Sequence, residues 1–285
     1  MAVKNTLTTN GNQRLGITAF LNSEKVLENI EQALGKTDKQ RFITGVISAV
    51  NTNPALQECT NKSILSGALL GESLKLSPSP QLGHYYLVPF NDKTQGKVAQ
   101  FQLGYKGYIQ LAIRSGQYKK LNVLAVKEGE LEYFDPLNED IKINLMVDKW
   151  DEREATETIG YYAMFELTNG FRKAIYWSKQ QMENHALKYS PGYKAKKGFT
   201  FWEKNFDGMA FKTMLRQLIS KWGIMSTELQ QAFVNDMTFT DDSGAVKYVE
   251  ADENIIEAEV VVDEQPEKTE DSVNGTDAAS ALFGN

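Results

Sequence analysis

Two stretches of this sequence carry basic side chains with few or no acidic ones, and this pattern predicts binding to polyanions. The first stretch, from Lys93 to Lys127, holds seven Lys or Arg and no Asp or Glu. The second, from His185 to Trp222, holds eight Lys or Arg against two acids. Ordinary protein surfaces mix both signs, so these stretches create a field that attracts phosphates. A solvated helix face is the plainer interpretation of any single row of this kind.

Aromatic residues are interleaved with the basic ones in both stretches. In the first, Tyr105 and Tyr108 lie beside Lys106, and in the second the segment PGYKAKKGFTFWEK includes Trp202. Rings that stack on bases, next to cations that contact phosphates, are typical of single-strand binding. The alternative is that these rings belong to the core. The glycines that flank Lys106, Gly104 and Gly107, either let the backbone approach a phosphate chain or serve helix packing.

The acidic net charge of −6 conceals two unlike regions. From Phe239 to Asn285 there are thirteen Asp or Glu and two Lys, a net charge of −11. The remaining residues carry 29 basic and 24 acidic groups, a net charge of +5. An acidic segment with almost no aromatic residues predicts a disordered tail. Such a tail either only solubilises the protein, covers the basic surface transiently, or attracts partners.

The sequence contains no recognisable catalytic, metal or cofactor motif. Gly35-Lys36-Thr37 resembles the end of a phosphate-binding loop, but Ile30 stands where that motif needs a glycine, so Gly35 is better interpreted as a helix C-cap. One cysteine, Cys59, and two histidines cannot form a zinc site, and we expect Cys59 to be buried. We therefore expect a binding protein, not an enzyme, with no cofactor.

The composition is that of a soluble globular protein. Of its 285 residues, 41% are apolar, which is enough to form a sizeable core. The first residues lack an apolar signal region, and no later window is long and apolar enough to cross a bilayer. We therefore expect a cytoplasmic protein that does not contact membranes.

Hydrophobic periodicity predicts helices in the first part of the chain. One runs from Ser23 to Leu34. A second begins with Asp38 as its cap and ends before Pro54, and a third begins with Asn61 as its cap.

After Gly83 the pattern changes to that of strands. Residues 84–90 and 98–103 predict a hairpin, followed by a helix over Tyr105–Ser115 and a strand near Leu121–Val126. A second hairpin, Ile159–Leu167 with Phe171–Trp177, turns at Asn169-Gly170. Ser178 begins a helix, and Phe206–Trp222 form a long amphipathic helix.

The predicted fold class is α+β. It has N-terminal helices, central β-hairpins with a crossing helix, a long C-terminal amphipathic helix and a disordered acidic tail. We expect Tyr105, Ile109, Ala112 and Ile113 of the crossing helix to turn inward, and Lys106 and Arg114 to share an outer face. We divide the chain into a flexible segment 1–22, one functional domain 23–238 and the tail 239–285.

Four segments, in this order, resemble the RecT family of phage and prophage single-strand annealing recombinases. They are NPALQECTNKSILSGALLGESLKLSPSPQLGHYYLVPF, FQLGYKGYIQLAIRSGQYKKLNVLAVKEGEL, NGFRKAIYW and FKTMLRQLISKWGI. The combination of Tyr-Leu-Val-Pro-Phe, Gly-Tyr-Lys-Gly and Arg-Ser-Gly-Gln is specific, and the likeness covers about residues 40 to 225. The N-terminal twenty residues and the tail lie outside it.

The resemblance implies binding and ATP-independent annealing of single-stranded DNA, in a bacterial or phage-infected cell. It also implies a homo-oligomer, as a ring or helical filament, that works beside a phage exonuclease and a host single-strand-binding protein. At the matching positions we predict DNA contacts from two groups of residues. The basic group is Lys106, Arg114, Lys119, Lys120, Arg172, Lys173, Lys196, Lys197, Lys212 and Arg216; the aromatic group is Tyr105, Tyr108 and Trp202.

Three other functions stay open at this point. A metal-dependent nuclease needs clustered carboxylates, whereas the acids of the basic region are scattered. A sequence-specific duplex binder needs a recognition helix, and no helix-turn-helix pattern is found. A general nucleic-acid-binding protein without annealing activity fits the same basic residues.

Overall fold

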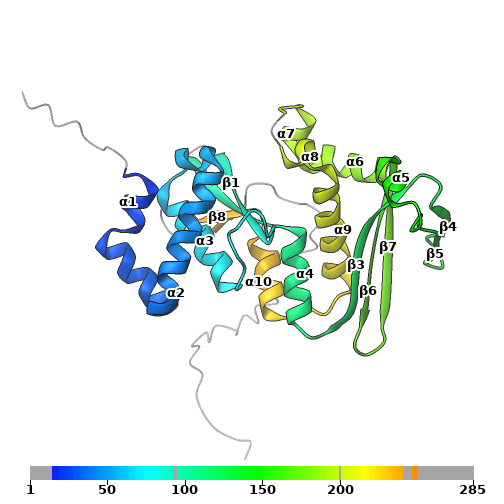
Figure 1. Cartoon of the computed structure of the whole chain (residues 1–285), viewed down its shortest axis with the longest axis horizontal. Helices are drawn as coiled ribbons and strands as arrows, with labels where there is room; N and C mark the ends of the chain where they lie inside the picture. The colour runs from blue at the N-terminus through cyan, green and yellow to red at the C-terminus, as the bar shows by residue number, and fades with distance from the viewer. Residues whose placement is uncertain (1–14, 93–94, 199, 241–245, 249–285) are drawn as a thin grey trace, which may run out of the picture. The chain divides into compact units, whose positions relative to one another are not determined.

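The computed structural model describes residues 15–92, 95–198, 200–240 and 246–248 (Figure 1). They belong to one compact unit that ends at Ala251, whereas residues 252–285 form a separate unit outside the described residues. The described residues form an α+β fold of helices and small antiparallel sheets, which confirms the predicted fold class. Most of the predicted tail lies outside the described residues, so its disorder stays a prediction.

The chain begins with helices, as predicted. These are α1 (Ile17–Leu21), α2 (Glu24–Thr52), the 3-10 helix η1 (Pro54–Glu58) and α3 (Asn61–Ser73). Gly35 has φ 80° and interrupts α2 at the expected boundary between two helices, because only glycine adopts this conformation readily. The predicted cap of α3 was wrong by one residue: the Thr60 hydroxyl accepts a hydrogen bond from the Ser63 N–H.

The first hairpin forms as predicted and is followed by the crossing helix. Strands β1 (Tyr85–Asp92) and β2 (Gly96–Leu103) pair antiparallel, and α4 (Tyr105–Arg114) follows directly. Strand β8 (Thr238–Thr240) pairs with β2, and β9 (Val246–Tyr248) pairs with β8. These last two strands lie at and beyond the predicted start of the tail. Regular structure therefore extends further along the chain than expected.

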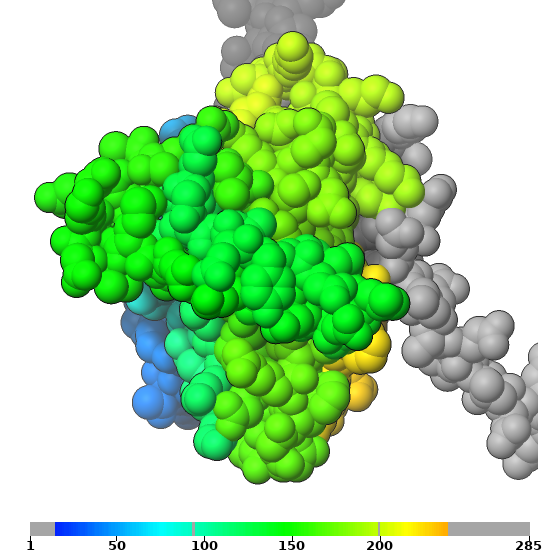
Figure 2. Space-filling view, turned by 90° about the vertical axis from the view of Figure 1, so that its right-hand side faces the viewer, coloured from blue at the N-terminus to red at the C-terminus, as the bar shows by residue number. Residues whose placement is uncertain are grey.

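The second sheet contains the other predicted hairpin. Strands β3 (Tyr118–Lys127), β6 (Thr158–Leu167) and β7 (Arg172–Ser178) are antiparallel, in the order β3-β6-β7. Between β3 and β6 the chain forms a smaller hairpin, β4 (Leu131–Asp135) and β5 (Asp140–Ile143), and helix α5 (Trp150–Ala155). In Figure 2 the green residues of this part of the chain face the viewer. The sequence did not predict β4, β5 or α5.

The remaining helices follow the second sheet. They are α6 (Lys179–Tyr189), α7 (Pro191–Lys194), α8 (Phe201–Lys204), α9 (Phe206–Trp222) and α10 (Thr227–Asn235). The capping box of Ser178 and Gln181 begins α6 as predicted.

The buried apolar side chains form two clusters, and α9 contributes to both. The first cluster lies among α2, α3, the β1–β2 hairpin, α4 and α10, and includes Cys59, as expected. The second lies between the β3-β6-β7 sheet and α6, α8 and α9. Leu215 and Ile219 of α9 belong to the first cluster, and Met214 and Leu218 belong to the second. In Figure 1, α9 accordingly lies between α4 and the strands β3 and β6.

The buried face of α4 differs from the predicted one. Tyr108, Leu111 and Ala112 are buried, whereas Ile113 is 59% exposed. The reason is tertiary: Tyr108 packs edge-on against Phe233 of α10, which the local pattern of α4 does not reveal. Only Ala112 of the four predicted inward residues is fully buried.

Candidate nucleic-acid interface

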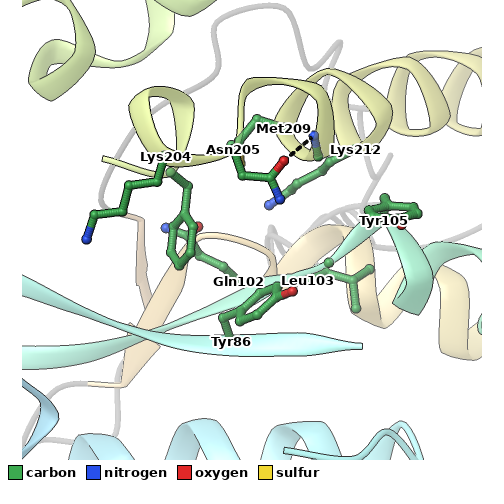
Figure 3. A pocket seen from close by; sticks show the side chains of 11 residues that line it. Tyr86, Gln102, Leu103, Tyr105, Lys204, Asn205, Met209 and Lys212 are labelled. Atoms are coloured by element: carbon green, nitrogen blue, oxygen red, sulfur yellow. Dashed lines mark hydrogen bonds between the residues drawn. The ribbon is translucent and has the colours of Figure 1, made fainter. Parts of the chain in front are cut away.

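A pocket of about 160 Å³ lies where the β1–β2 hairpin meets α4, α8 and the first turns of α9. Figure 3 shows Tyr86 on the hairpin side, with Asn205, Met209 and Lys212 on the helix side and Tyr105 at one end. Its lining residues are Tyr86, Gln102, Leu103, Gly104, Tyr105, Phe201, Lys204, Asn205, Gly208, Met209 and Lys212. Lys106 lies beside the pocket, close to Tyr86. A Cβ built on Gly83 would stand 3.4 Å from the Lys106 side chain and 3.0 Å from the Tyr86 hydroxyl.

Three half-buried rings line this pocket. Tyr86 and Phe201 have ring centroids 5.4 Å apart, and Tyr105 packs edge-on against Phe211 at 5.6 Å. Burial, together with the neighbouring Tyr105, raises the pKa of Tyr86 above its usual value. The sequence indicated Tyr105 but missed Tyr86, because the alternating pattern of β1 marks it only as a strand residue.

Two glycines let the start of α4 approach the segment that precedes β1. A Cβ on Gly104 would overlap the carbonyl oxygen of Gly83, and one on Gly107 would overlap that of His84. The Gly104 N–H donates to His84 O at 2.9 Å. The packing interpretation of these glycines is therefore the one that the structure supports, and this close contact brings Lys106 to Gly83 and Tyr86.

The two basic stretches meet at this pocket, although residues 128–184 separate them in sequence. Lys106 comes from the first stretch, and Lys204 and Lys212 come from the second. Lys106 and Lys204 are exposed, and within the described part of the chain neither forms an ion pair. In Figure 3 the Lys204 side chain extends away from the rings. Basic side chains from both stretches therefore contribute to the electrostatic potential at this one pocket.

Behind the pocket, the buried carboxylate of Asp236 holds two of the predicted DNA-contacting cations. Its Oδ1 accepts hydrogen bonds from Lys212 Nζ at 3.0 Å and from Leu103 N at 2.8 Å. Its Oδ2 accepts from Arg216 Nη1 at 2.7 Å and from the Tyr108 hydroxyl at 3.0 Å. Burial alone would raise the pKa of Asp236, but Lys212 and Arg216 outweigh it and hold this pKa below its usual range.

Five predicted contact residues are inside the protein, and one of them, Lys173, is 7% exposed on the second sheet. Tyr108 is fully buried, Lys212 is 5% exposed and Trp202 is 7% exposed. Arg216 is largely covered, with 13% of its side chain exposed. Burial raises the pKa of Tyr108 well above its usual value. The predicted surface positions of Tyr108, Lys212 and Arg216 were wrong, because these three residues surround Asp236. Trp202 packs against Phe206 in the second cluster, in agreement with the core alternative for this ring.

A second group of cations surrounds Glu166 on the β3-β6-β7 sheet. Lys119 and Lys120 contact the Glu166 carboxylate at 2.6 and 3.2 Å, and Arg172 is its register partner on β7. Lys119 and Lys120 hold the pKa of Glu166 below its usual value by hydrogen bonding to its carboxylate. The first stretch thus does have a counter-charge, which the local sequence did not reveal, and this one carboxylate pairs with two lysines.

The remaining predicted cations lie in different surroundings. Arg114 is exposed and its guanidinium donates to Leu74 O at 2.5 Å and to Lys75 O at 3.3 Å, at the end of α3. Lys196 and Lys197 are exposed in the turn after α7. Lys173 is mostly buried, pairs with Glu139 and lies over the Trp222 ring at 3.6 Å.

Two further properties concern the described residues alone. Among residues 15–92, 95–198, 200–240 and 246–248, no cluster of three or more His, Cys, Asp or Glu side chains is placed to bind a metal ion. Across the same ranges, no helix has the length and apolar character that a bilayer span requires.

The fold and this surface define an α+β protein with cations and rings gathered around one pocket, as in nucleic-acid-binding proteins. The chain belongs to the RecT family, whose pattern it matches over residues 40–265. It is 42% identical to the uncharacterised protein YqaK of Bacillus subtilis over 226 residues, covering 79% of this chain and 74% of that one. It is 30% identical to protein RecT of Escherichia coli over 224 residues, covering 77% of this chain and 80% of that one. This membership confirms the predicted family and supports a general role in DNA recombination and annealing.

Proposed function

We propose that this protein binds single-stranded DNA over the surface around Lys106 and Lys204 and anneals complementary strands without nucleotide hydrolysis. The observation that carries the proposal is the meeting of the two basic stretches at one pocket lined by rings. Cations along such a surface neutralise phosphates, and rings tolerate any base. The RecT family membership of the chain supports the same activity.

The described cations extend from this pocket along the length of α4. Lys106 lies in the first turn of the helix and Arg114 in its last turn, and Lys119 and Lys120 follow on β3. Ten helical residues span about 15 Å, so these side chains supply several separated positions for phosphates. In this proposal the strand passes Lys204 and Lys106 and continues toward the cations around Glu166.

Pairing itself provides the driving force for annealing. Each correct base-pair step contributes about 1.4 kcal/mol, so ten steps contribute about 14 kcal/mol. Two bare strands repel each other as polyanions, and neutralising their phosphates lowers that barrier. The protein then needs only to hold one strand extended until its complement pairs, and ATP is not required.

An annealing assay tests this proposal. Two labelled complementary oligonucleotides are mixed with the full chain, without ATP and with EDTA, and duplex formation is followed by fluorescence. We expect the protein to accelerate pairing well above the rate of the free strands. Binding without acceleration would instead show a general nucleic-acid-binding protein, and degradation of the strands on adding magnesium would show a nuclease.

The contribution of the pocket cations is measured by the salt dependence of single-strand binding. Each lost phosphate contact reduces the slope of log K against log salt by about 0.7 on a single strand. We therefore expect Lys106→Ala with Lys204→Ala to reduce the slope by about 1.4. Lys25→Ala with Lys36→Ala on α2 is the matched control, because it removes the same charge from exposed positions outside the RecT match. An equal slope in the folded pocket variant would exclude Lys106 and Lys204 from the DNA path.

We further propose that the protein works as a homo-oligomer, in accord with its family, and meets an exonuclease and a single-strand-binding protein in the cell. Sedimentation with and without DNA measures the first point. Pull-down of each purified partner measures the second.

A further inference from the structure

The ring-lined pocket has features that phosphate neutralisation alone does not require. Tyr86, Tyr105 and Phe201 present half-buried rings to one space of about 160 Å³. The amide side chains of Gln102 and Asn205 line the same space, and the buried Lys212 reaches it from α9. A phosphate path needs exposed cations, which Lys106 and Lys204 already supply outside the rings.

The charge balance of the pocket disfavours a phosphate as its occupant. The Lys212 ammonium lies 3.0 Å from the Asp236 carboxylate, so this cation already has a counter-charge. The other cation of the lining, Lys204, extends away from the rings (Figure 3). The walls are mostly flat and uncharged, and rings of this kind stack on planar groups. The volume is below the 300–1,000 Å³ that is usual for drug-sized ligands, which favours a smaller planar group.

We propose that this pocket takes up one nucleobase of the bound single strand, with a ring of the lining stacked on one face of the base and the Gln102 and Asn205 amides at its edge. This inference rests on the proposed single-strand binding and specifies how the strand is held. Unstacked bases of single strands are recognised in this way, by stacking on aromatic side chains and hydrogen bonding at their edges. The neighbouring phosphates then lie within reach of Lys106 and Lys204.

A base held in this pocket is withheld from the complementary strand. Each protein copy therefore anchors the strand at one nucleotide and leaves the following bases free to pair. Annealing on several copies then proceeds in short runs, interrupted at the nucleotide that each pocket holds. Pairing becomes continuous only when the protein releases the strand.

A comparison of two DNA strands with two pocket variants tests the inference. The probes are a 30-nucleotide oligo(dT) and a strand of equal length built from abasic spacers, which has the same phosphates but no bases. We measure both dissociation constants at one salt concentration for the wild type, Tyr105→Ala and Met209→Trp. Tyr105→Ala removes a ring and Met209→Trp fills the space. Tyr133→Ala is the control, because it removes a ring that is 43% exposed on β4 and lines no part of the pocket.

We expect the wild type to bind oligo(dT) at least about tenfold more tightly than the abasic strand, in line with the usual contribution of base stacking. In both pocket variants this preference should fall by about tenfold, while affinity for the abasic strand stays the same. Tyr133→Ala should keep the full preference. An undiminished preference in pocket variants with intact circular dichroism would overturn the inference.

The two proposals fail in different ways. Equal binding of both strands by the wild type overturns the base pocket and leaves single-strand binding in place, whereas binding of neither strand removes both proposals. If the variants lose their fold, permanganate oxidation of thymines in the wild-type complex decides. Thymines that react more slowly in the complex than in the free strand support the base pocket, and unchanged reactivity of all thymines excludes it.

Discussion

At the scale of single residues, Asp236 has the most contacts that the sequence did not anticipate. Its carboxylate joins α4, β2, α9 and the end of α10 through Tyr108, Leu103, Lys212 and Arg216. Replacing a buried carboxylate that has two cationic partners is strongly destabilising, because the partners would then lie buried without a counter-charge. Asp236 thus explains why two predicted DNA-contacting cations face inward.

We expect Asp236→Asn to destabilise the protein by about 3 to 5 kcal/mol at pH 7, as is usual when a buried ion pair is broken. Urea unfolding measures this free energy. Asp148→Asn, at an exposed position, is the matched control and should change the free energy by less than about 0.5 kcal/mol.

The stability difference between the wild type and Asp236→Asn should also depend on pH. Because the pKa of Asp236 is lowered in the folded state, its stabilising contribution is complete above the ordinary Asp pKa of about 3.9. The contribution is lost as the pH falls through the lower folded value. The difference in unfolding free energy between wild type and Asp236→Asn should therefore be constant from pH 7 to about 5 and narrow below about 4. A difference that stays constant into that acidic range would contradict this assignment.

At the scale of elements, the position of α4 depends on its contact with the chain before β1. Helical glycine is normally about 1 kcal/mol worse than alanine, so Gly107→Ala would stabilise an isolated helix. Here the added Cβ meets the His84 carbonyl oxygen and the Leu103 side chain. We expect Gly107→Ala to destabilise the protein by about 1 to 3 kcal/mol, as overpacking does. The measurement is thermal or urea unfolding.

Gly16→Ala provides the comparison for this prediction. A Cβ at Gly16 meets nothing within 4 Å, so the substitution should be close to neutral. If Gly107→Ala proved as stable as the wild type, the close approach of α4 to His84 would not be needed for the fold.

The elements that the sequence predicted are those with strong local signals. The β1–β2 and β6–β7 hairpins have alternating residues and turn signals, and Gly35 marks a helix end through its positive φ. Helices can be predicted in the same way, because the hydrophobic periodicity of a helical segment is visible in a single sequence. Of the residues at the pocket, Tyr105 in its lining and Lys106 beside it were named from the sequence as DNA contacts, because basic and aromatic residues are adjacent there.

The elements and contacts that the sequence missed depend on distant partners. The start of β4 is fixed by the buried pair of Glu130 and Arg153, whose atoms lie 2.5 Å apart across 23 residues. Helix α10 contributes Phe233, which packs on Tyr108, and so decides which face of α4 turns inward. The hydrophobic pattern of α4 alone does not reveal the contact with Phe233, and for this reason Tyr108 was predicted at the surface.

At the scale of the whole molecule, charge is divided among three regions. Besides the basic stretches and the acidic C-terminal residues, the segment 128–157 around β4, β5 and α5 carries eleven acids and three bases. This segment has a net charge of −8 and repels a polyanion. None of the residues that line the pocket belongs to this segment.

We expect the acidic C-terminal residues to weaken the binding of single-stranded DNA. Residues 252–285 carry ten acids and one base, and they form a unit separate from the described fold. Removing them changes the net charge from −6 to +3. We expect truncation after Ala251 to increase single-strand affinity at low salt, with the difference disappearing at high salt as screening shortens the range of the field.

This boundary keeps β8 and β9, which truncation at residue 238 would remove. Fluorescence anisotropy with a labelled oligonucleotide at two salt concentrations measures the effect. Equal affinities of the two proteins at low salt would show that the acidic residues do not compete with DNA and leave solubility or the attraction of partners as their role.

Helix α9 contributes side chains to both hydrophobic clusters, and this has a consequence for how a strand is admitted. A hinge motion that separated the two clusters would expose apolar side chains of both, because α9 belongs to each of them. In the proposed function, the strand therefore binds a surface whose shape the fold already determines. The flexible strand, and not the protein, then makes most of the conformational adjustment.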